Sequence, residues 1–132
     1  MTREEVFAGV CECLAEVLDL PAGPIREEQK LIDDLGADSL DLLDLTFHLE
    51  QMFRISISPR DIERRAKAKL DGRPLEVDGV YTPEALAELR TALPEVPAEE
   101  LSEGLTAAAL PRRFRVATMV NLICRLLEEK GE

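Results

Sequence analysis

Hydrophobic residues recur three or four positions apart along most of the chain, which is the spacing of one face of an α-helix. The first such stretch runs from Val6 to Val17 and follows Thr2 and Glu5, which stand at the spacing of a capping box. We expect this helix to end at the residues that open the next loop, Pro21, Gly23 and Pro24.

The same spacing, together with two Ser/Thr-Pro pairs that suit helix starts, predicts further helices along the chain. Residues 71–81 contain Asp78-Gly79 and suit a loop or a weak hairpin. The chain is therefore predicted to be all-α. The expected helices after the first one cover about 38/39–53, 59–70, 83–93, 98–110 and 115–129.

The second predicted helix is apolar on two opposite sides. One side is an ordinary core-facing stripe that consists of Leu42, Leu45, Leu49, Met52 and Phe53. The other side consists of apolar residues with carboxylates beside them, namely Leu40, Leu43, Phe47, Asp41, Asp44 and Glu50. Such a strip is typical of a docking surface, where apolar residues give affinity and acids steer a basic partner. The alternative is that a later part of the chain covers this side as core.

Ser39 stands at the start of this second helix. A helix N-terminus presents unpaired N–H groups and a partial positive charge, so it is a favourable place for a phosphate ester. Spacing alone favours the more ordinary alternative of a serine that caps the helix.

The net charge of −11 is concentrated in the first fifty residues, which hold three basic and thirteen acidic side chains and a net charge of −10. A field of this sign disfavours nucleic acid and anionic membranes as partners. No apolar run approaches the ~20 residues needed to span a bilayer, and the N-terminal residues do not resemble a signal peptide. We expect a cytoplasmic monomer that neither binds nucleic acid nor inserts stably into membranes.

Cysteine and histidine give little support to catalysis or metal binding. The three cysteines have no CxxC spacing, and Cys13 and Cys124 fall on apolar helical stripes, so buried free thiols are expected. His48 is the single histidine, and a metal site, a Ser-His-Asp triad or a Cys-His dyad would each have to use it. We therefore predict no metal site and no catalytic residues.

The segment Leu35-Gly36-Ala37-Asp38-Ser39-Leu40-Asp41 closely resembles the signature of acyl carrier proteins, in which the serine carries 4′-phosphopantetheine. The resemblance covers residues 1–66, which repeat the family's first helix, long loop, Asp-Ser-Leu helix and short third helix, and residues 114–129, which look like its last helix. It implies an acyl-carrier-like four-helix bundle with an additional helical insertion between helices III and IV.

The resemblance implies specific roles for individual residues. Ser39 would be the attachment site for phosphopantetheine taken from coenzyme A, and Asp38 and Leu40 its neighbours read by a phosphopantetheinyl transferase. Residues that match partner-docking positions are Leu40, Asp41, Leu43, Asp44, Phe47 and Glu50. Residues that match positions lining the interior where the family shelters an acyl chain are Leu42, Leu45, Thr46, Leu49, Ile57 and Ile62.

Residues 67–113 depart from the family, which joins its last two helices by a short turn. Within a single domain of residues 1–132, we expect 1–66 and 114–132 to form the carrier core and 67–113 a structured insertion. Its leucines require burial, so the insertion is expected either to lid the acyl-binding interior or to be a recognition surface itself. The third helix is unusually basic, at Arg60, Arg64, Arg65, Lys67 and Lys69. These residues suit a solvated face, or they pair with the acidic second helix or select particular partners.

The resemblance implies a carrier rather than an enzyme. Acyl groups would be held as thioesters on the prosthetic arm and delivered to partner enzymes with basic docking patches. A specialised fatty-acid biosynthesis or lipid pathway is expected, by analogy from the insertion. Two alternatives stay open: a peptidyl or polyketide carrier, and a helical interaction module whose serine is never modified.

Overall fold

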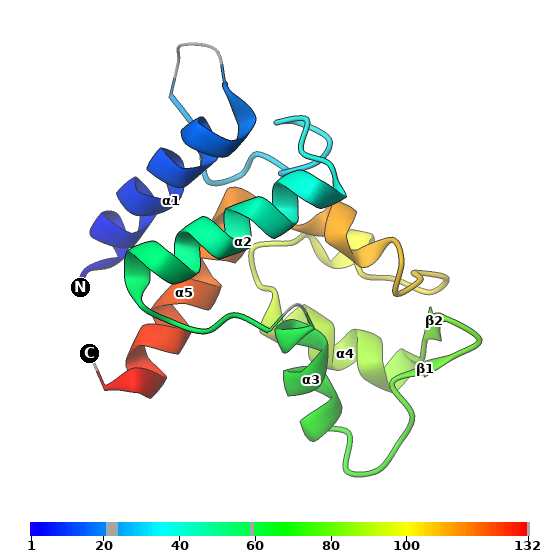
Figure 1. The fold of residues 1–132 in the computed structure, drawn as a ribbon. Coiled ribbons are helices and arrows are strands. Elements are labelled where there is room, and N and C mark those ends of the chain that lie inside the picture. The colour runs from blue at the N-terminus through cyan, green and yellow to red at the C-terminus, as the bar shows by residue number, and fades with distance from the viewer. Residues whose placement is uncertain (21–23, 59, 132) are drawn as a thin grey trace. The chain divides into compact units, whose positions relative to one another are not determined.

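The computed structural model describes residues 1–20, 24–58 and 60–131, and they are mostly helical (Figure 1). The predicted chain-breaking residues Pro21, Gly23 and Pro59 lie outside the described residues. The chain divides into two compact units, one made of residues 1–57 and 114–132 and the other of residues 58–113. The all-α prediction, with a carrier-like bundle and extra helical structure before the last helix, is confirmed.

The first unit contains three helices: α1 (Arg3–Leu18), α2 (Ser39–Phe53) and α5 (Val116–Lys130). Helix α1 packs on both α2 and α5. It begins with the predicted capping box between Thr2 and Glu5. Apolar residues from all three helices meet in one core, which consists of Val6, Val10, Cys13, Leu14, Leu31, Leu45, Leu49, Phe53, Val116, Val120, Ile123 and Leu127.

Helices α1 and α2 approach each other closely at Gly9. A Cβ atom at this position would lie 2.6 Å from the Phe53 ring and 2.9 Å from the Met52 sulfur. Glycine in the middle of a helix weakens it by about 1 kcal/mol relative to alanine, because its backbone loses more freedom on folding. Here that cost is offset by the packing of the Phe53 ring against the helix backbone.

The loop between α1 and α2 is fastened to the start of α5 by main-chain hydrogen bonds. The N–H of Leu31 donates to the Phe114 carbonyl at 3.1 Å, and the N–H of Val116 donates to the Gln29 carbonyl at 3.0 Å. These bonds hold the middle of the loop that leads to α2, and Leu31 is itself fully buried. The described part of the loop that contains Gln29 and Leu31 is therefore held by tertiary contacts, as its apolar content suggests.

The second unit contains α3 (Asp61–Ala68), β1 (Glu76–Val77), β2 (Val80–Tyr81), α4 (Pro83–Ala92) and the 3₁₀ turns η1 (Ala98–Glu100) and η2 (Leu110–Arg113). Helix α3 packs on α4. The strands pair antiparallel around Asp78 and Gly79, which both have positive φ, as a tight hairpin turn requires. The insertion leucines are buried, as expected: Leu86, Leu89, Leu93, Leu101 and Leu105.

Two expectations for this region differ from the structure. The predicted helix over 98–110 is wrong, because only η1 and the start of η2 are helical there and Gly104 adopts a left-handed φ of 97°. Helix α3, which the sequence placed with the carrier core of residues 1–66, groups instead with the inserted residues. The physical reason is that α3 packs on α4, a helix that the insertion supplies.

Candidate functional site

The N-terminus of α2 is closed by two aspartates that cap each other. The Asp38 side chain accepts a hydrogen bond from the Asp41 N–H at 2.8 Å, and the Asp41 side chain accepts one from the Asp38 N–H at 3.1 Å. Asp38 is therefore the N-cap residue and Asp41 stands at the third helical position. Carboxylates there also interact favourably with the positive end of the helix.

Ser39 occupies the first helical position and is exposed. Because Asp38 caps the helix, the alternative of a capping serine is excluded. Among the described residues, no side chain or backbone group hydrogen bonds to the Ser39 hydroxyl or to the N–H groups of Ser39 and Leu40. The site thus presents a free hydroxyl beside unpaired N–H donors at a helix start, which suits a phosphate ester.

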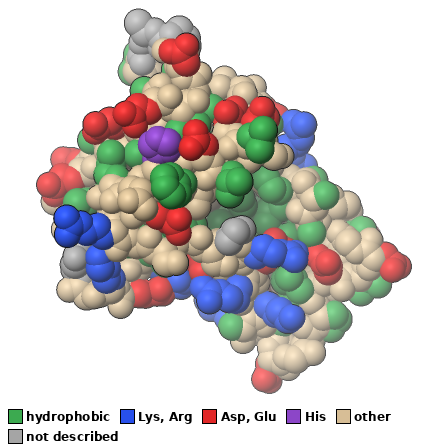
Figure 2. Space-filling model, viewed as in Figure 1, with side chains coloured by type: hydrophobic (Ala, Val, Ile, Leu, Met, Phe, Trp, Pro, Cys, Tyr) green, Lys and Arg blue, Asp and Glu red, His purple; other side chains and the backbone are tan. Residues whose placement is uncertain are grey.

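A row of exposed apolar side chains follows Ser39 along α2. Leu40, Leu43 and Phe47 are 76%, 65% and 59% exposed, although residues of this kind are usually buried. Figure 2 shows exposed hydrophobic side chains with carboxylates beside them over α2. Within the first unit, this side of α2 is therefore not part of the core.

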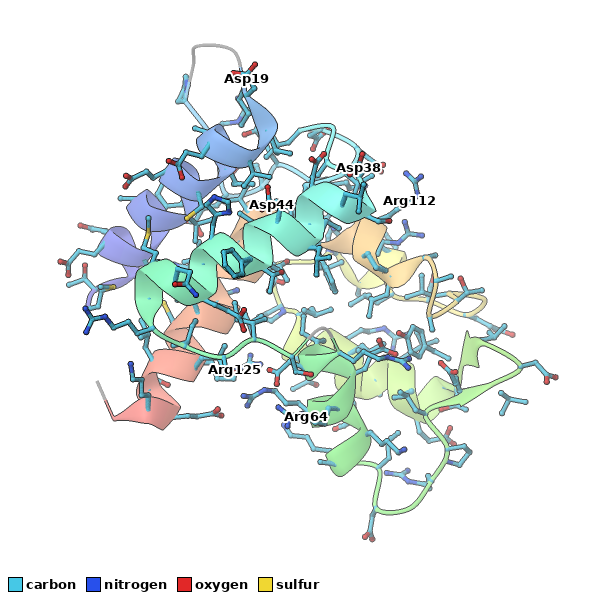
Figure 3. All side chains as sticks on the ribbon, viewed as in Figure 1. Asp19, Asp38, Asp44, Arg64, Arg112 and Arg125 are labelled. Atoms are coloured by element: carbon cyan, nitrogen blue, oxygen red, sulfur yellow. The ribbon has the colours of Figure 1, made fainter. Side chains whose placement is uncertain are left out.

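The three predicted docking acids are not equivalent in the structure. Asp44 is exposed and projects outward (Figure 3), and Asp41 is engaged in the cap described above. Glu50 is half-buried, and its Oε2 accepts a hydrogen bond from the Ile57 N–H at 2.7 Å. Glu50 therefore holds the backbone after α2, which leaves Asp44 as the most accessible carboxylate of the three.

His48 is a residue of this surface that the sequence argument left aside. Its Nδ1 lies 2.8 Å from the Asp44 backbone oxygen and 3.4 Å from the Asp44 carboxylate, and its ring stands edge-on to Phe47. The sequence does contain a signal for this contact, because residues four positions apart on a helix, such as Asp44 and His48, lie on the same face.

The residues expected to line an acyl-binding interior are divided between the two units. Leu45 and Leu49 are buried in the core of the first unit, and Leu42 and Ile57 pack against that core. The half-buried Thr46 donates its hydroxyl proton to the Leu42 carbonyl at 2.9 Å, so its polar group is satisfied within α2. Ile62 is buried on α3 in the second unit.

The cysteines are free thiols. Cys13 is buried, as predicted, whereas Cys124 is only partly buried. Burial, with smaller contributions from Glu16 and Glu12, raises the pKa of Cys13 to about 11, so this thiol is protonated at neutral pH. Within the described part of the chain, no three His, Cys, Asp or Glu side chains cluster as metal ligands, and no helix has the length and apolar composition to span a membrane.

Comparisons with known proteins agree with this site. The family model "Phosphopantetheine attachment site" matches residues 8–66. An acyl carrier protein of Thermotoga maritima is 44% identical over 63 residues, which are 48% of this chain and 78% of the relative. Another, of an Exiguobacterium species, is 39% identical over 66 residues, which are 50% of this chain and 84% of the relative. No solved structure gives a significant match.

Proposed function

Because this chain belongs to the acyl carrier protein family, we propose that Ser39 is the residue that carries its 4′-phosphopantetheine. The observation that supports this assignment is the exposed Ser39 hydroxyl at the first position of α2, which the Asp38 cap leaves without a hydrogen bond among the described residues. Members of this family are carriers rather than enzymes, and their prosthetic group is covalently attached.

The residues present at the start of α2 fit the group. A phosphodiester on Ser39 would lie beside the N–H groups of Ser39 and Leu40 and at the positive end of the helix. The bound group supplies a thiol that holds an acyl chain as a thioester. Asp38 and Asp41 fix the first turn of α2, so the acceptor hydroxyl is presented in one defined position.

The exposed row on α2 supports a role in docking partner enzymes. Leu40, Leu43 and Phe47 would contact the partner, and Asp44 would attract its basic groups. The family implies a phosphopantetheinyl transferase and acyl-processing enzymes as partners. Encounters steered by an exposed carboxylate weaken with salt, which suits a carrier that must leave each enzyme after transfer.

For the acyl chain, we extend the proposal to the interior of the first unit. Leu45 and Leu49 are fully packed, so an acyl chain would displace neighbouring side chains as it enters. Each buried methylene contributes ~0.8 kcal/mol, which gives several methylenes enough free energy to compete with that repacking. The partly buried Leu42 and Ile57 stand at the margin of this core and are the side chains expected to move first.

The pathway is proposed to be a specialised branch of fatty-acid or lipid metabolism. The support is the second unit, since the family model matches only residues 8–66 and the two relatives align with about half of the chain. Residues 67–113 are proposed to be a structured insertion in a single carrier chain, in accordance with their buried leucines.

The test is intact-mass spectrometry of the apo protein after incubation with coenzyme A and a broad-specificity phosphopantetheinyl transferase. We expect the mass to rise by one phosphopantetheine, and Ser39→Ala to abolish the increase. Ser56→Ala, at another exposed serine, serves as the matched control and should load as the wild type does. An unchanged wild-type mass with several transferases would instead indicate an interaction module.

A further inference from the structure

Helix α3 carries a concentration of positive charge in an otherwise acidic chain. We call the α3 basic surface the group of residues Arg60, Arg64, Arg65, Lys67 and Lys69. Arg60 and Arg64 have side chains that are 65% and 67% exposed, and Lys67 and Lys69 are exposed as well. Figure 2 shows Lys and Arg side chains gathered over this helix, and Figure 3 shows Arg64 projecting from its ribbon.

Two of these guanidinium groups are held by a buried carboxylate. Asp61 is only 3% exposed, and it accepts hydrogen bonds from Arg64 and, at 2.7 Å, from the Arg65 Nε. Burial alone would raise the pKa of Asp61, but the hydrogen bonds from Arg65 and Arg64 outweigh it and hold the pKa below its ordinary value. Asp61 is therefore ionised at neutral pH and keeps both arginines in place.

A third guanidinium, that of Arg60, is held in the same manner. It donates two hydrogen bonds to the carboxylate of Glu63, at 3.2 and 2.9 Å, and the Glu63 side chain is itself largely buried. An arginine has five N–H donors, so the bonds described leave most of the donors of Arg60 and Arg64 unused. Three guanidinium groups of α3 are thus held in position, and those of Arg60 and Arg64 keep donors available to a partner.

A merely solvated helix face does not explain this arrangement. The carboxylate of Asp61 is buried and interacts with two arginines of the same helix, whereas ordinary surface charges need no buried anchor. Fixed side chains lose less conformational entropy when they bind, so the same arrangement favours recognition. Lys67 and Lys69 add two charges that make no ion pair within the described residues.

We propose that the α3 basic surface is a second docking surface and that its occupant is an acidic patch on a partner protein. Guanidinium groups fixed in position match carboxylates in both charge and geometry. Duplex DNA fits less well, because its charge extends along its whole length and would also meet the many carboxylates of a chain with a net charge of −11. A lipid surface fits less well because the apolar residues of α3, Ile62 and Ala66, are buried.

The experiment measures fluorescence anisotropy of a labelled helical peptide that presents four glutamates on one face, titrated with the full-length apo protein at low salt. A peptide with glutamine at those four positions is the reference probe. We expect binding of the glutamate peptide alone, and a weakening of about tenfold or more in Lys67→Glu/Lys69→Glu, since both attractions become repulsions. Ser39→Ala should bind as the wild type does, which separates this result from the carrier role.

The matched control reverses two exposed arginines elsewhere, Arg26→Glu/Arg90→Glu, and changes the net charge by the same amount. Equal losses in the two variants, or equal binding of the two peptides, would overturn the proposal. So would tighter binding of duplex DNA or of phosphatidylglycerol vesicles with the same dependence on Lys67 and Lys69. Asp61→Asn should weaken binding to an intermediate extent, with folding checked by the fluorescence of Tyr81, the single tyrosine.

Discussion

Helices α2 and α3 both place acidic residues in their first turn but use them differently. In α2, Asp38 and Asp41 cap each other, so their carboxylates serve the backbone and leave Ser39 free. In α3, the N-cap residue Arg60 makes no side-chain capping hydrogen bond among the described residues, and Asp61 instead holds two arginines. The difference shows how one residue type can prepare a site for a covalent group in one helix and fix a charged surface in another.

The two helices also differ in what they expose. The outer side of α2 exposes Leu40, Leu43 and Phe47, whereas α3 buries its apolar residues and exposes cations. An apolar row gains its binding energy from burial, which depends little on salt, while a basic surface binds mainly through charge, which salt screens. Mutations at each helix can therefore test whether the two surfaces have separate roles.

The largest expected difference in stability is between mutations on the two opposite faces of α2. Leu49→Ala should lower the free energy of unfolding by about 2–5 kcal/mol, because it leaves a cavity in a packed core. Phe47→Ala removes a larger side chain from the exposed row, yet it should change the free energy of unfolding by less than about 0.5 kcal/mol. Urea unfolding followed by circular dichroism measures both. A large loss in Phe47→Ala would show that this side of α2 is covered core and would contradict the docking role.

The next effect concerns the buried carboxylate of α3. Asp61→Asn should destabilise the protein by about 1–2 kcal/mol at pH 6, because the amide cannot accept the two charged hydrogen bonds and Arg64 is largely in solvent. Because the pKa of folded Asp61 lies below its ordinary value of 3.8, the wild type keeps this contribution above that pH and loses it as the pH falls through the folded pKa.

The difference between wild type and Asp61→Asn should therefore shrink from pH 6 to pH 3, as measured by urea unfolding with Tyr81 fluorescence. Glu103→Gln, at an exposed acid outside the helices, provides the control and should show little change. A difference that stays constant with pH would mean that Asp61 contributes through packing rather than charge.

The smallest expected effect on stability comes from mutations of Asp38, the N-cap residue of α2 that stands next to Ser39. Asp38→Ala should cost about 1 kcal/mol, because the Asp41 N–H loses its acceptor, whereas Asp38→Ser keeps a capping oxygen and should cost only a few tenths. Thermal unfolding of the two variants measures the difference, with Asp44→Ala as an exposed control. Equal stability of Asp38→Ala and Asp38→Ser would show that capping by Asp38 does not explain why the Ser39 hydroxyl is free.

Local sequence determined much of the first unit. Helical spacing, the Thr2–Glu5 box and the residues around Ser39 act over a few positions, so α1, α2 and α5 begin and end close to where they were predicted. The exposed row on α2 was likewise readable, because apolar residues on the side opposite a core stripe need no further part of the chain to define them.

Only the tertiary structure decided the features that depend on contacts between distant residues. No local pattern could show that α3 packs on α4, that Glu50 binds the Ile57 N–H, or that Asp61 becomes a buried anchor. The segment 98–110 has helical spacing at Leu101 and Leu105, yet both leucines are buried without forming a helix. Periodicity specifies which residues need burial, and the packing of the folded chain specifies what covers them.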